Sequence, residues 1–202
     1  MKRRDFLKLS GAVVAGAAAP AWLQVRALAG ESFELDNDID ILNFALLIAY
    51  FERSFYDRGV QENLVTGRRE ALLRDIRANE IDHITELREA IRSRGSDPIE
   101  EPVFEFGRAY ADTEKFLANA YQFESTGVSA YLEVIGRARD RGVVEELTGI
   151  YGNECRHAAL VARMNDVGPD DVFGGAVQVP KTTDFVAQVF DPYMPDRERP
   201  QA

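Results

Sequence analysis

Cysteine is almost absent from this sequence, since Cys155 is the only one among 202 residues. A single cysteine excludes an internal disulfide framework, and we interpret Cys155 as a small buried apolar residue rather than a nucleophile. A domain of this length buries roughly two thirds of its unfolded surface, so it needs no such cross-links. Sustained alternation of apolar and polar residues is also missing, which argues against a sheet. The sequence therefore predicts an all-α protein held together by its apolar core.

Lysine is scarce after residue 29, where only Lys115 and Lys181 remain. The whole chain has a formal net charge of −10. The first 29 residues hold five basic side chains and one acidic one, so the rest of the chain is more acidic still. An acidic surface repels phosphate backbones, and we therefore expect no nucleic-acid partner.

The chain begins with the pattern of a signal peptide. Residues 2–8 are rich in basic side chains, residues 9–23 form a short apolar run, and residues 27–29 read Ala-Leu-Ala, a small-x-small cleavage pattern. The apolar run is too short and too rich in alanine and glycine to anchor well, so we expect no stable membrane span after cleavage. The sequence thus predicts a signal peptide over residues 1–29; the alternative is a basic segment that is retained as an anchor.

The paired arginines Arg3 and Arg4, followed by Asp-Phe-Leu-Lys, resemble a twin-arginine export signal. Lys2 stands where that signal usually has serine or threonine. The resemblance implies the twin-arginine export machinery as a partner and a periplasmic or extracellular location. Because this route carries folded proteins, it also favours a metal or cofactor that is inserted before export.

Four amphipathic segments follow, each ended by glycine or proline. They predict helices over about residues 38–58, 69–94, 108–139 and 143–165. The longest connection, residues 98–107, lies between the second and third segments, which is typical of an antiparallel four-helix bundle with a long crossover. We assign the bundle to residues 36–168 and a C-terminal extension to residues 169–202. We expect the apolar side chains of that extension to drape over an apolar seam of the bundle, namely Phe185, Phe190 and Tyr193.

Acidic and histidine residues interrupt the apolar stripes of three helices. Glu80 and His83 lie in the middle of the second stripe, Glu154 and His157 in the middle of the fourth, and Glu124 in the third. Buried carboxylates without partners cost several kcal/mol, and no basic side chain lies on these stripes. A pair of divalent cations would turn the acids and imidazoles into ligands. Both histidines of the protein occur in a Glu-x-x-His motif, which places the two side chains one turn apart on the same helix face.

The second half of the domain repeats the first at a nearly constant offset. Glu80 and His83 recur as Glu154 and His157, and Tyr56 recurs as Tyr131 at an offset only one position longer. Each tyrosine closes an apolar stripe. The two residues are interpreted as bundle-filling side chains, or else as hydrogen-bond donors to the site or electron relays. Glu124 precedes Tyr131 by seven residues, and the position seven residues before Tyr56 is Ala49. The first half therefore lacks the acid that the repeat predicts.

Glu52 is the candidate substitute for that missing acid, because it lies one turn beyond Ala49 on nearly the same face of the helix. The alternative is a surface acid paired with Arg53 or Arg58. If Glu52 reaches the cluster, the site has six ligands. If it does not, five ligands remain and one metal position is weak.

Four stretches of the chain resemble the ferritin-like domain family, which includes plant desiccation-related proteins and many exported microbial members. They are residues 40–46, 55–56, 124–131 and 154–158. The family is similar in site plan to rubrerythrins and manganese catalases. The resemblance implies a bundle of ferritin-like topology and two divalent metal ions, iron or manganese. The ligand set it implies, completed by the candidate substitute, is Glu52, Glu80, His83, Glu124, Glu154 and His157.

Three functions remain open from the sequence. The first is a di-iron or di-manganese oxidoreductase that oxidises ferrous ion or removes peroxide outside the cytoplasm. The second is a non-enzymatic protein of stress or desiccation protection, in which metal holds the helices together. The third is a metal-free bundle with relic ligands. Bundles of this type often form dimers, so a homodimer is an expected assembly, whereas a hollow mineral-storing shell is not.

Overall fold

The structure is a computed structural model that describes residues 35–168 and 177–194. These residues form five α-helices and two short 3₁₀-helices, and no strand occurs among them. The prediction of an all-α fold is therefore confirmed. The elements are α3 (Asp38–Gln61), α4 (Arg68–Ser93), η1 (Gly107–Tyr110), α5 (Thr113–Ile135), α6 (Arg141–Met164), α8 (Thr183–Phe190) and η2 (Asp191–Tyr193).

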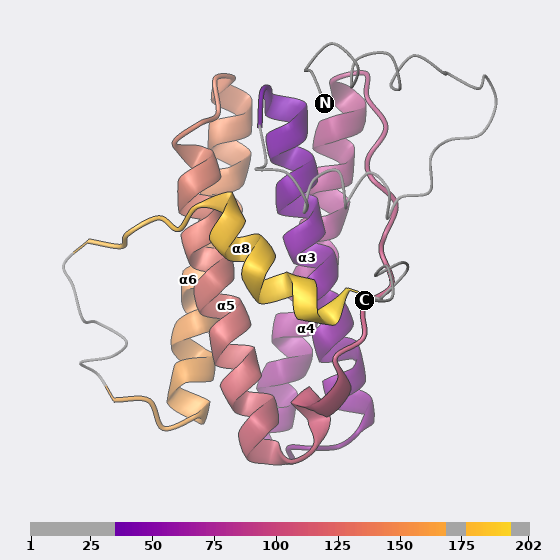
Figure 1. Ribbon diagram of the computed structural model, residues 1–202, viewed down its shortest axis with the longest axis vertical. Helices are drawn as coiled ribbons and strands as arrows, with labels where there is room; N and C mark the ends of the chain where they lie inside the picture. Colours follow the sequence, from indigo (N-terminus) through magenta and orange to yellow (C-terminus); the bar gives the residue numbers. More distant parts are fainter. Residues whose placement is uncertain (1–34, 169–176, 195–202) are drawn as a thin grey trace, which may run out of the picture.

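The four long helices form a bundle of ferritin-like topology (Figure 1). α3 packs against α4, and α5 packs against α6, each as an antiparallel pair. Residues 94–112 run back along the length of the bundle, so that α4 and α5 point in the same direction. This crossover distinguishes the fold from a simple up-and-down bundle.

Side-chain caps fix where most of these helices begin. The side chain of Asn37 accepts hydrogen bonds from the backbone N–H groups of Ile39 and Asp40. Asp112 caps α5 in the same way, and Asp140 caps α6. A cap of this kind stabilises a helix by about 1 kcal/mol. Three of the four bundle helices thus start at a polar residue that the sequence supplies locally.

The third predicted helix, residues 108–139, is longer than the helix in the structure. α5 begins only at Thr113, because Asp112 caps it and the residues before it form the 3₁₀-helix η1. It ends at Ile135, directly before Gly136. The sequence pattern did not separate η1 from α5, because both carry apolar residues at helical spacing.

Gly59 does not end the first helix, which continues to Gln61. An added Cβ at Gly59 would lie 2.3 Å from the ring of Phe116, so glycine is needed there for close packing between α3 and α5. Cys155 also differs from expectation, because it is only partly buried.

Aromatic side chains attach the crossover to α3. The Tyr110 hydroxyl donates to the backbone carbonyl of Phe55 at 2.9 Å, and the rings of Phe104 and Phe106 meet the ring of Phe51 edge to face. Edge-to-face pairs add about 1 kcal/mol each beyond the area they bury. The crossover is therefore packed into the core rather than lying loosely on the surface.

The short helix α8 crosses α5 and α3 on the outside of the bundle (Figure 1). The Phe190 ring stacks on the Phe51 ring with centroids 3.9 Å apart, and the Tyr193 hydroxyl donates to Asn119 at 2.9 Å. Both side chains cover the seam, as expected from the sequence. Phe185 does not, since it is 38% exposed.

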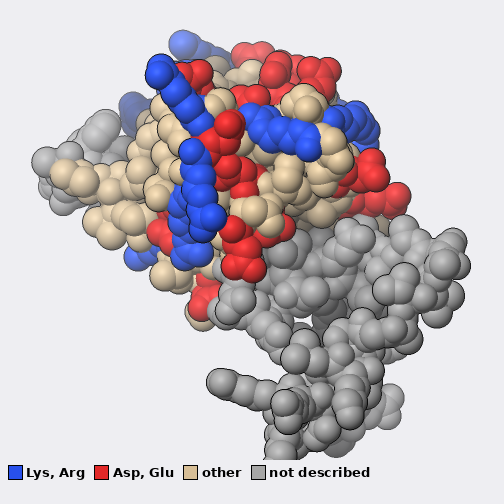
Figure 2. Space-filling view, turned by 90° about the horizontal axis from the view of Figure 1, so that it is seen from above, with Lys and Arg blue, Asp and Glu red and all other residues tan. Residues whose placement is uncertain are grey.

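The surface mixes the two signs of charge. Seen from above, the end of the bundle carries acidic and basic side chains beside one another (Figure 2). Arg94, after α4, pairs with Asp140 at 3.1 Å and with Glu146 at 3.3 Å, and so links α4 to the start of α6. None of the helices in the described part of the chain combines the length and apolarity that a membrane-spanning segment needs.

Candidate metal centre

The middles of the four bundle helices bring all six candidate ligands together in the core. The four glutamates have an exposed fraction of 0%, and the two histidines are 7% and 4% exposed. One residue comes from α3, two from α4, one from α5 and two from α6. They are Glu52, Glu80, His83, Glu124, Glu154 and His157.

Both imidazole rings turn their Nδ1 atoms toward the carboxylates. His83 Nδ1 lies 3.1 Å from Glu80 Oε2 and 3.1 Å from Glu154 Oε1. His157 Nδ1 lies 3.0 Å from Glu80 Oε1, and 3.8 Å from an oxygen of Glu124 and of Glu154. Acids and imidazoles of two helix pairs therefore meet within contact distance at the bundle axis.

Glu52 belongs to this cluster and is not a surface acid. Arg53 pairs instead with Asp57 and Glu101, and Arg58 pairs with Glu62. The Glu52 carboxylate lies in a group with Glu124 and Glu154, in which one oxygen of each lies within 4.8 Å of the others. The alternative of a solvent-exposed Glu52 is therefore wrong.

A glycine on the facing helix makes room for the Glu52 carboxylate. An added Cβ at Gly127 of α5 would lie 2.6 Å from Glu52 Oε1, closer than such contacts allow. Ala49, one turn before Glu52, is itself fully buried. The acid of α3 has thus moved by one turn relative to the repeat, and the backbone of α5 accommodates it there.

Seven buried polar atoms of this cluster have no hydrogen-bond partner among the described residues. They are both oxygens of Glu52, both of Glu154, Glu80 Oε1, Glu124 Oε2 and His157 Nδ1. Several lie within ion-pair distance of each other but are not aligned for hydrogen bonds. An unsatisfied buried polar group costs about 1–3 kcal/mol, and more when it is charged. Divalent cations would satisfy all seven at once, so the donor set fits metal ions.

The cluster holds protons to balance its charge. Burial raises the pKa of Glu52 well above its ordinary value, helped by the neighbouring carboxylates, and burial also raises the pKa of Glu124. Burial lowers the pKa of an imidazole, but the glutamate carboxylates close to each Nδ1 atom outweigh it and raise the pKa of His83 to about 10 and of His157 to about 11. For Glu154, burial raises the pKa, but the two histidine rings close to its carboxylate outweigh burial and lower the pKa to about 2. A cation that bound here would have to displace these protons.

Two asparagines hold the outer edges of the histidine rings, and the sequence reasoning missed them. Asn153 Nδ2 lies 3.0 Å from His157 Nε2 and 3.3 Å from His83 Nε2, and it donates to Asn79 Oδ1 at 2.8 Å. Asn79 Oδ1 lies 3.1 Å from His157 Nε2 and can accept its proton, which leaves Nδ1 free to bind metal. Each asparagine directly precedes a Glu-x-x-His motif and so shares the repeat of the two motifs, and this was the signal available in the sequence.

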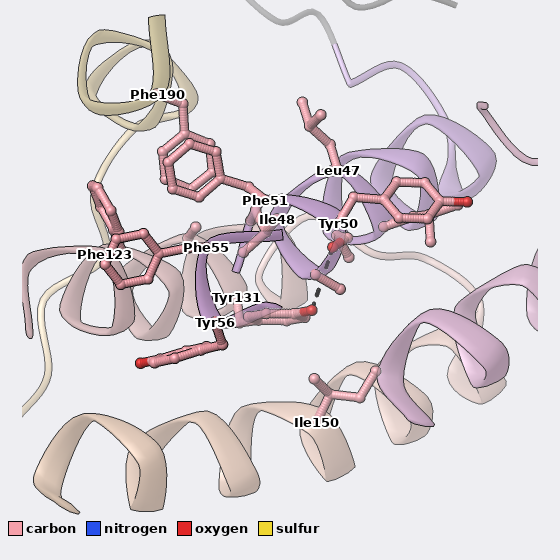
Figure 3. Close-up of a cluster of buried hydrophobic side chains, with 14 of the residues drawn as sticks. Leu47, Ile48, Tyr50, Phe51, Phe55, Tyr56, Phe123, Tyr131, Ile150 and Phe190 are labelled. Atoms are coloured by element: carbon pink, nitrogen blue, oxygen red, sulfur yellow. Dashed lines mark hydrogen bonds between the residues drawn. The ribbon is translucent and has the colours of Figure 1, made fainter. Parts of the chain in front are cut away.

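Two tyrosines of the core, Tyr56 and Tyr131, lie close to the carboxylates of the cluster. The Tyr56 hydroxyl donates to Glu124 Oε1 at 2.5 Å, and the Tyr131 hydroxyl reaches the carbonyl of Ala45 at 3.4 Å. Figure 3 shows both rings on the side of the core that faces α6, which carries Ile150. Burial, followed by the nearby carboxylates, raises the pKa of both phenols, so they stay protonated. Tyr56 is therefore a hydrogen-bond donor to the site, whereas Tyr131 mainly fills the bundle.

A four-helix bundle that holds glutamates and histidines at the level where its helices meet defines a carboxylate–histidine class of metal-site proteins. Residues 37–166 match the ferritin-like domain family, and the chain belongs to that family. Residues 1–20 match the signal sequence of the twin-arginine translocation pathway, which marks the chain for export across the membrane. The comparison with individual curated proteins gives no match.

Proposed function

We propose that this exported protein binds two divalent ions, iron or manganese, at the six-residue cluster and uses them to oxidise ferrous ion or to remove peroxide. The single observation that carries the proposal is the convergence of seven unpartnered buried atoms from four helices. Their mixture of carboxylate oxygen and imidazole nitrogen suits both metals. The ferritin-like family and the export signal support the same conclusion.

The glutamates, the histidines and Tyr56 would have different roles in this centre. Iron or manganese bound here would supply reversible electron transfer to a small oxidant. The glutamates would bind the ions and neutralise their charge, and the histidines would bind through Nδ1. Tyr56 holds a proton on its hydroxyl 2.5 Å from Glu124 Oε1, so it can steady that carboxylate as its charge changes. The four glutamates are fully buried, so the apolar side chains around them keep bulk water away from the centre.

The test is the metal content of the exported chain, purified without chelator, beside a His83→Ala/His157→Ala double variant. We expect about two iron or manganese ions per chain and their loss in the variant. The purified protein should then oxidise ferrous ion or consume peroxide faster than the variant with the same amount of free metal. Metal at the level of the variant would overturn the proposal of a metal centre. Bound metal without either activity would overturn the proposed chemistry alone.

A second function, a metal that only holds the four helices together, is favoured by the closure of the site. All four carboxylates are fully buried, and such an enclosed centre suits ions that stay in place rather than ions that meet a reactant from the solvent. In that case chelation should lower the melting temperature while neither activity is present. The two functions thus give different results in the same pair of measurements.

A further inference from the structure

The cluster is closed in the structure, so a reactant from the solvent needs a route to it. All four glutamates are fully buried, and both histidine rings are nearly so. Each of the proposed reactions brings a small oxidant to the centre. Part of the protein around the cluster therefore has to open, and the contacts between α3 and α5 indicate where.

The seam between α3 and α5 is thin at Glu52. An added Cβ at Gly127 would lie 2.6 Å from Glu52 Oε1, so no side chain separates this oxygen from the backbone of α5. Phe51 directly precedes Glu52 in α3, and Phe123 lies one turn before the glycine in α5. The rings of Phe51 and Phe123 meet edge to face with centroids 4.8 Å apart. These two rings are the barrier beside the Glu52 carboxylate.

The helix α8 covers this barrier from the outside of the bundle (Figure 1). The Phe190 ring stacks on the Phe51 ring with centroids 3.9 Å apart, and it meets the Phe123 ring edge to face at 6.5 Å (Figure 3). Three aromatic rings, one each from α3, α5 and α8, therefore close the seam together. If α8 moves away, only two of the three remain.

The two ends of α8 are held to the bundle by bonds of different length. Before α8, the side-chain amide of Gln178 and the backbone N–H of Lys181 donate to Ser129 of α5 at 3.1 and 3.4 Å. After α8, the backbone carbonyl of Tyr193 accepts from the N–H of Glu105 at 2.7 Å, and the Tyr193 hydroxyl donates to α5 at 2.9 Å. The shorter bonds lie at η2, so motion of α8 about that end breaks only the weaker contacts.

Packing beneath α8 is incomplete. A cavity of about 10 Å³ lies between α8 and α3, lined among others by Phe44, Leu47 and Ile48 of α3 and by Val186 and Phe190 of α8. Side chains around a void lose dispersion contacts, which weakens the hold of α3 on α8. The lining is almost entirely apolar, so a hydrated ion would have to give up its water there, whereas a small uncharged molecule would not.

We propose that α8 is a lid over the Glu52 side of the centre, and that a small uncharged oxidant enters between α3 and α5 when this lid opens. The inference rests on the proposed function, because it supplies the route that the oxidant needs. α8 lies beyond residues 37–166, so the lid is not part of the matched ferritin-like domain. Its opening leaves Phe51 and Phe123 as the last side chains between the solvent and Glu52.

The experiment measures how fast a small uncharged probe reaches the centre. Nitric oxide binds ferrous ions and changes their visible absorption, so stopped-flow mixing with the ferrous-loaded exported chain gives its association and dissociation rates. In Phe190→Ala both rates should rise by at least about tenfold, because the loss of a buried ring makes opening of α8 more frequent. The affinity for nitric oxide should stay the same, since the lid changes access and leaves the ligands in place.

The same helix supplies the matched control. Phe185 is also a phenylalanine of α8, but its side chain is exposed, so Phe185→Ala should leave both rates unchanged. Val186→Ala removes a smaller buried side chain from the face that lines the cavity and should raise both rates less than Phe190→Ala does. Hydrogen exchange of the metal-free variants checks the bundle: the amides of α8 should lose protection, while those of α4 and α6 keep it.

The outcomes separate the inference from the function on which it rests. Nitric oxide rates that are the same in the unsubstituted chain, Phe190→Ala and Val186→Ala would overturn the lid and leave the metal centre standing. Rates that rise equally in Phe185→Ala and Phe190→Ala would also overturn it, because the effect would not depend on the face that covers the seam. Ferrous binding no stronger than in His83→Ala/His157→Ala would overturn the proposed function and the inference together.

Discussion

The two halves of the bundle repeat one pattern of site residues, but only the second half contains every residue of that pattern. In the second half, Glu124 precedes Tyr131 by seven residues; in the first, Ala49 precedes Tyr56 by the same distance. Tyr56 of α3 crosses to α5 and donates to Glu124 at 2.5 Å. The Tyr131 side chain of α5 likewise reaches α3, where position 49 is alanine and offers no carboxylate. The Tyr131 hydroxyl therefore contacts only the backbone carbonyl of Ala45, at 3.4 Å.

This difference shows that a repeat can keep its packing while it moves a charged group. The acid of the first half lies one turn along, at Glu52, where Gly127 leaves room for it. Tyr131 is buried in the core without a carboxylate partner, whereas Tyr56 has Glu124 as its partner. A difference of one helical turn thus leaves the fold intact and alters where the first half places its buried acid.

The largest effect that we expect is the pH dependence of metal binding. Each half of the bundle contributes one imidazole to it. The pKa of His83 is raised to about 10 and that of His157 to about 11, so at pH 7 both hold a proton that a metal must displace. Affinity should therefore rise with pH by about tenfold per pH unit for each proton released. Calorimetry in buffers of different ionisation enthalpy counts these protons, and we expect at least two. Release of none, or affinity that falls with pH, would contradict the charge balance described above.

The same shifts give the sign of a stability effect in the metal-free protein. Protonated imidazoles that are favoured in the folded state contribute stability that is complete below the unfolded pKa of 6.5. That contribution is lost as pH rises through about 10 and 11. The metal-free protein should therefore lose melting temperature between neutral and alkaline pH more steeply than the metal-bound protein, whose histidines carry no proton on Nδ1.

Restoring the acid of the first half is the next largest change. Glu52→Ala should remove about one metal ion per chain, and Ala49→Glu in the same variant should recover it, because position 49 is the repeat equivalent of Glu124. Metal content by elemental analysis, beside the helicity of each variant, provides the measurement. A folded double variant that binds no more metal than Glu52→Ala would show that the halves are not interchangeable at this position.

The asparagines allow the halves to be compared outside the ligand set. Asn153 contacts both histidines and Asn79, whereas Asn79 contacts one histidine. Removing a group that orients a metal-binding histidine typically costs about 10–100-fold in metal affinity. Asn153→Ala should therefore approach the upper end of that range and Asn79→Ala the lower end in Co²⁺ titrations. Equal affinities in the two variants and in the unsubstituted protein would remove both residues from the centre.

The fold and the cluster could be predicted from the sequence because each rests on periodicity. Helical spacing placed Glu80 and His83 on one buried face, and burial of acids without bases implied that the helices meet at a common centre. The sequence alone does not decide whether Glu52 is buried, because its position along the helix fits both a surface acid and a buried one. The six residues meet in the structure, while their role as ligands stays a prediction.

Contacts between helices were beyond that reasoning. The sequence does not distinguish the roles of the two helical glycines Gly59 and Gly127. In the structure, Gly59 leaves room for the ring of Phe116, and Gly127 leaves room for the carboxylate of Glu52. The start of α5 depended on a cap at Asp112 that follows a 3₁₀ turn with the same apolar spacing. Such features depend on which helix lies opposite, and a single sequence does not carry that information locally.

The smallest predicted effect tests the tyrosines that define the difference between the halves. Tyr56→Phe removes a 2.5 Å hydrogen bond to a buried carboxylate and should lower the free energy of unfolding of the metal-free protein by about 2 kcal/mol. Tyr131→Phe removes a 3.4 Å contact to a carbonyl and should cost less than about 1 kcal/mol. Denaturant unfolding of the two variants measures both values, and neither substitution creates a cavity. If Tyr131→Phe lowered the free energy of unfolding as much as Tyr56→Phe does, Tyr131 would have a strong polar partner. The first half would then supply such a partner for Tyr131 although position 49 is alanine.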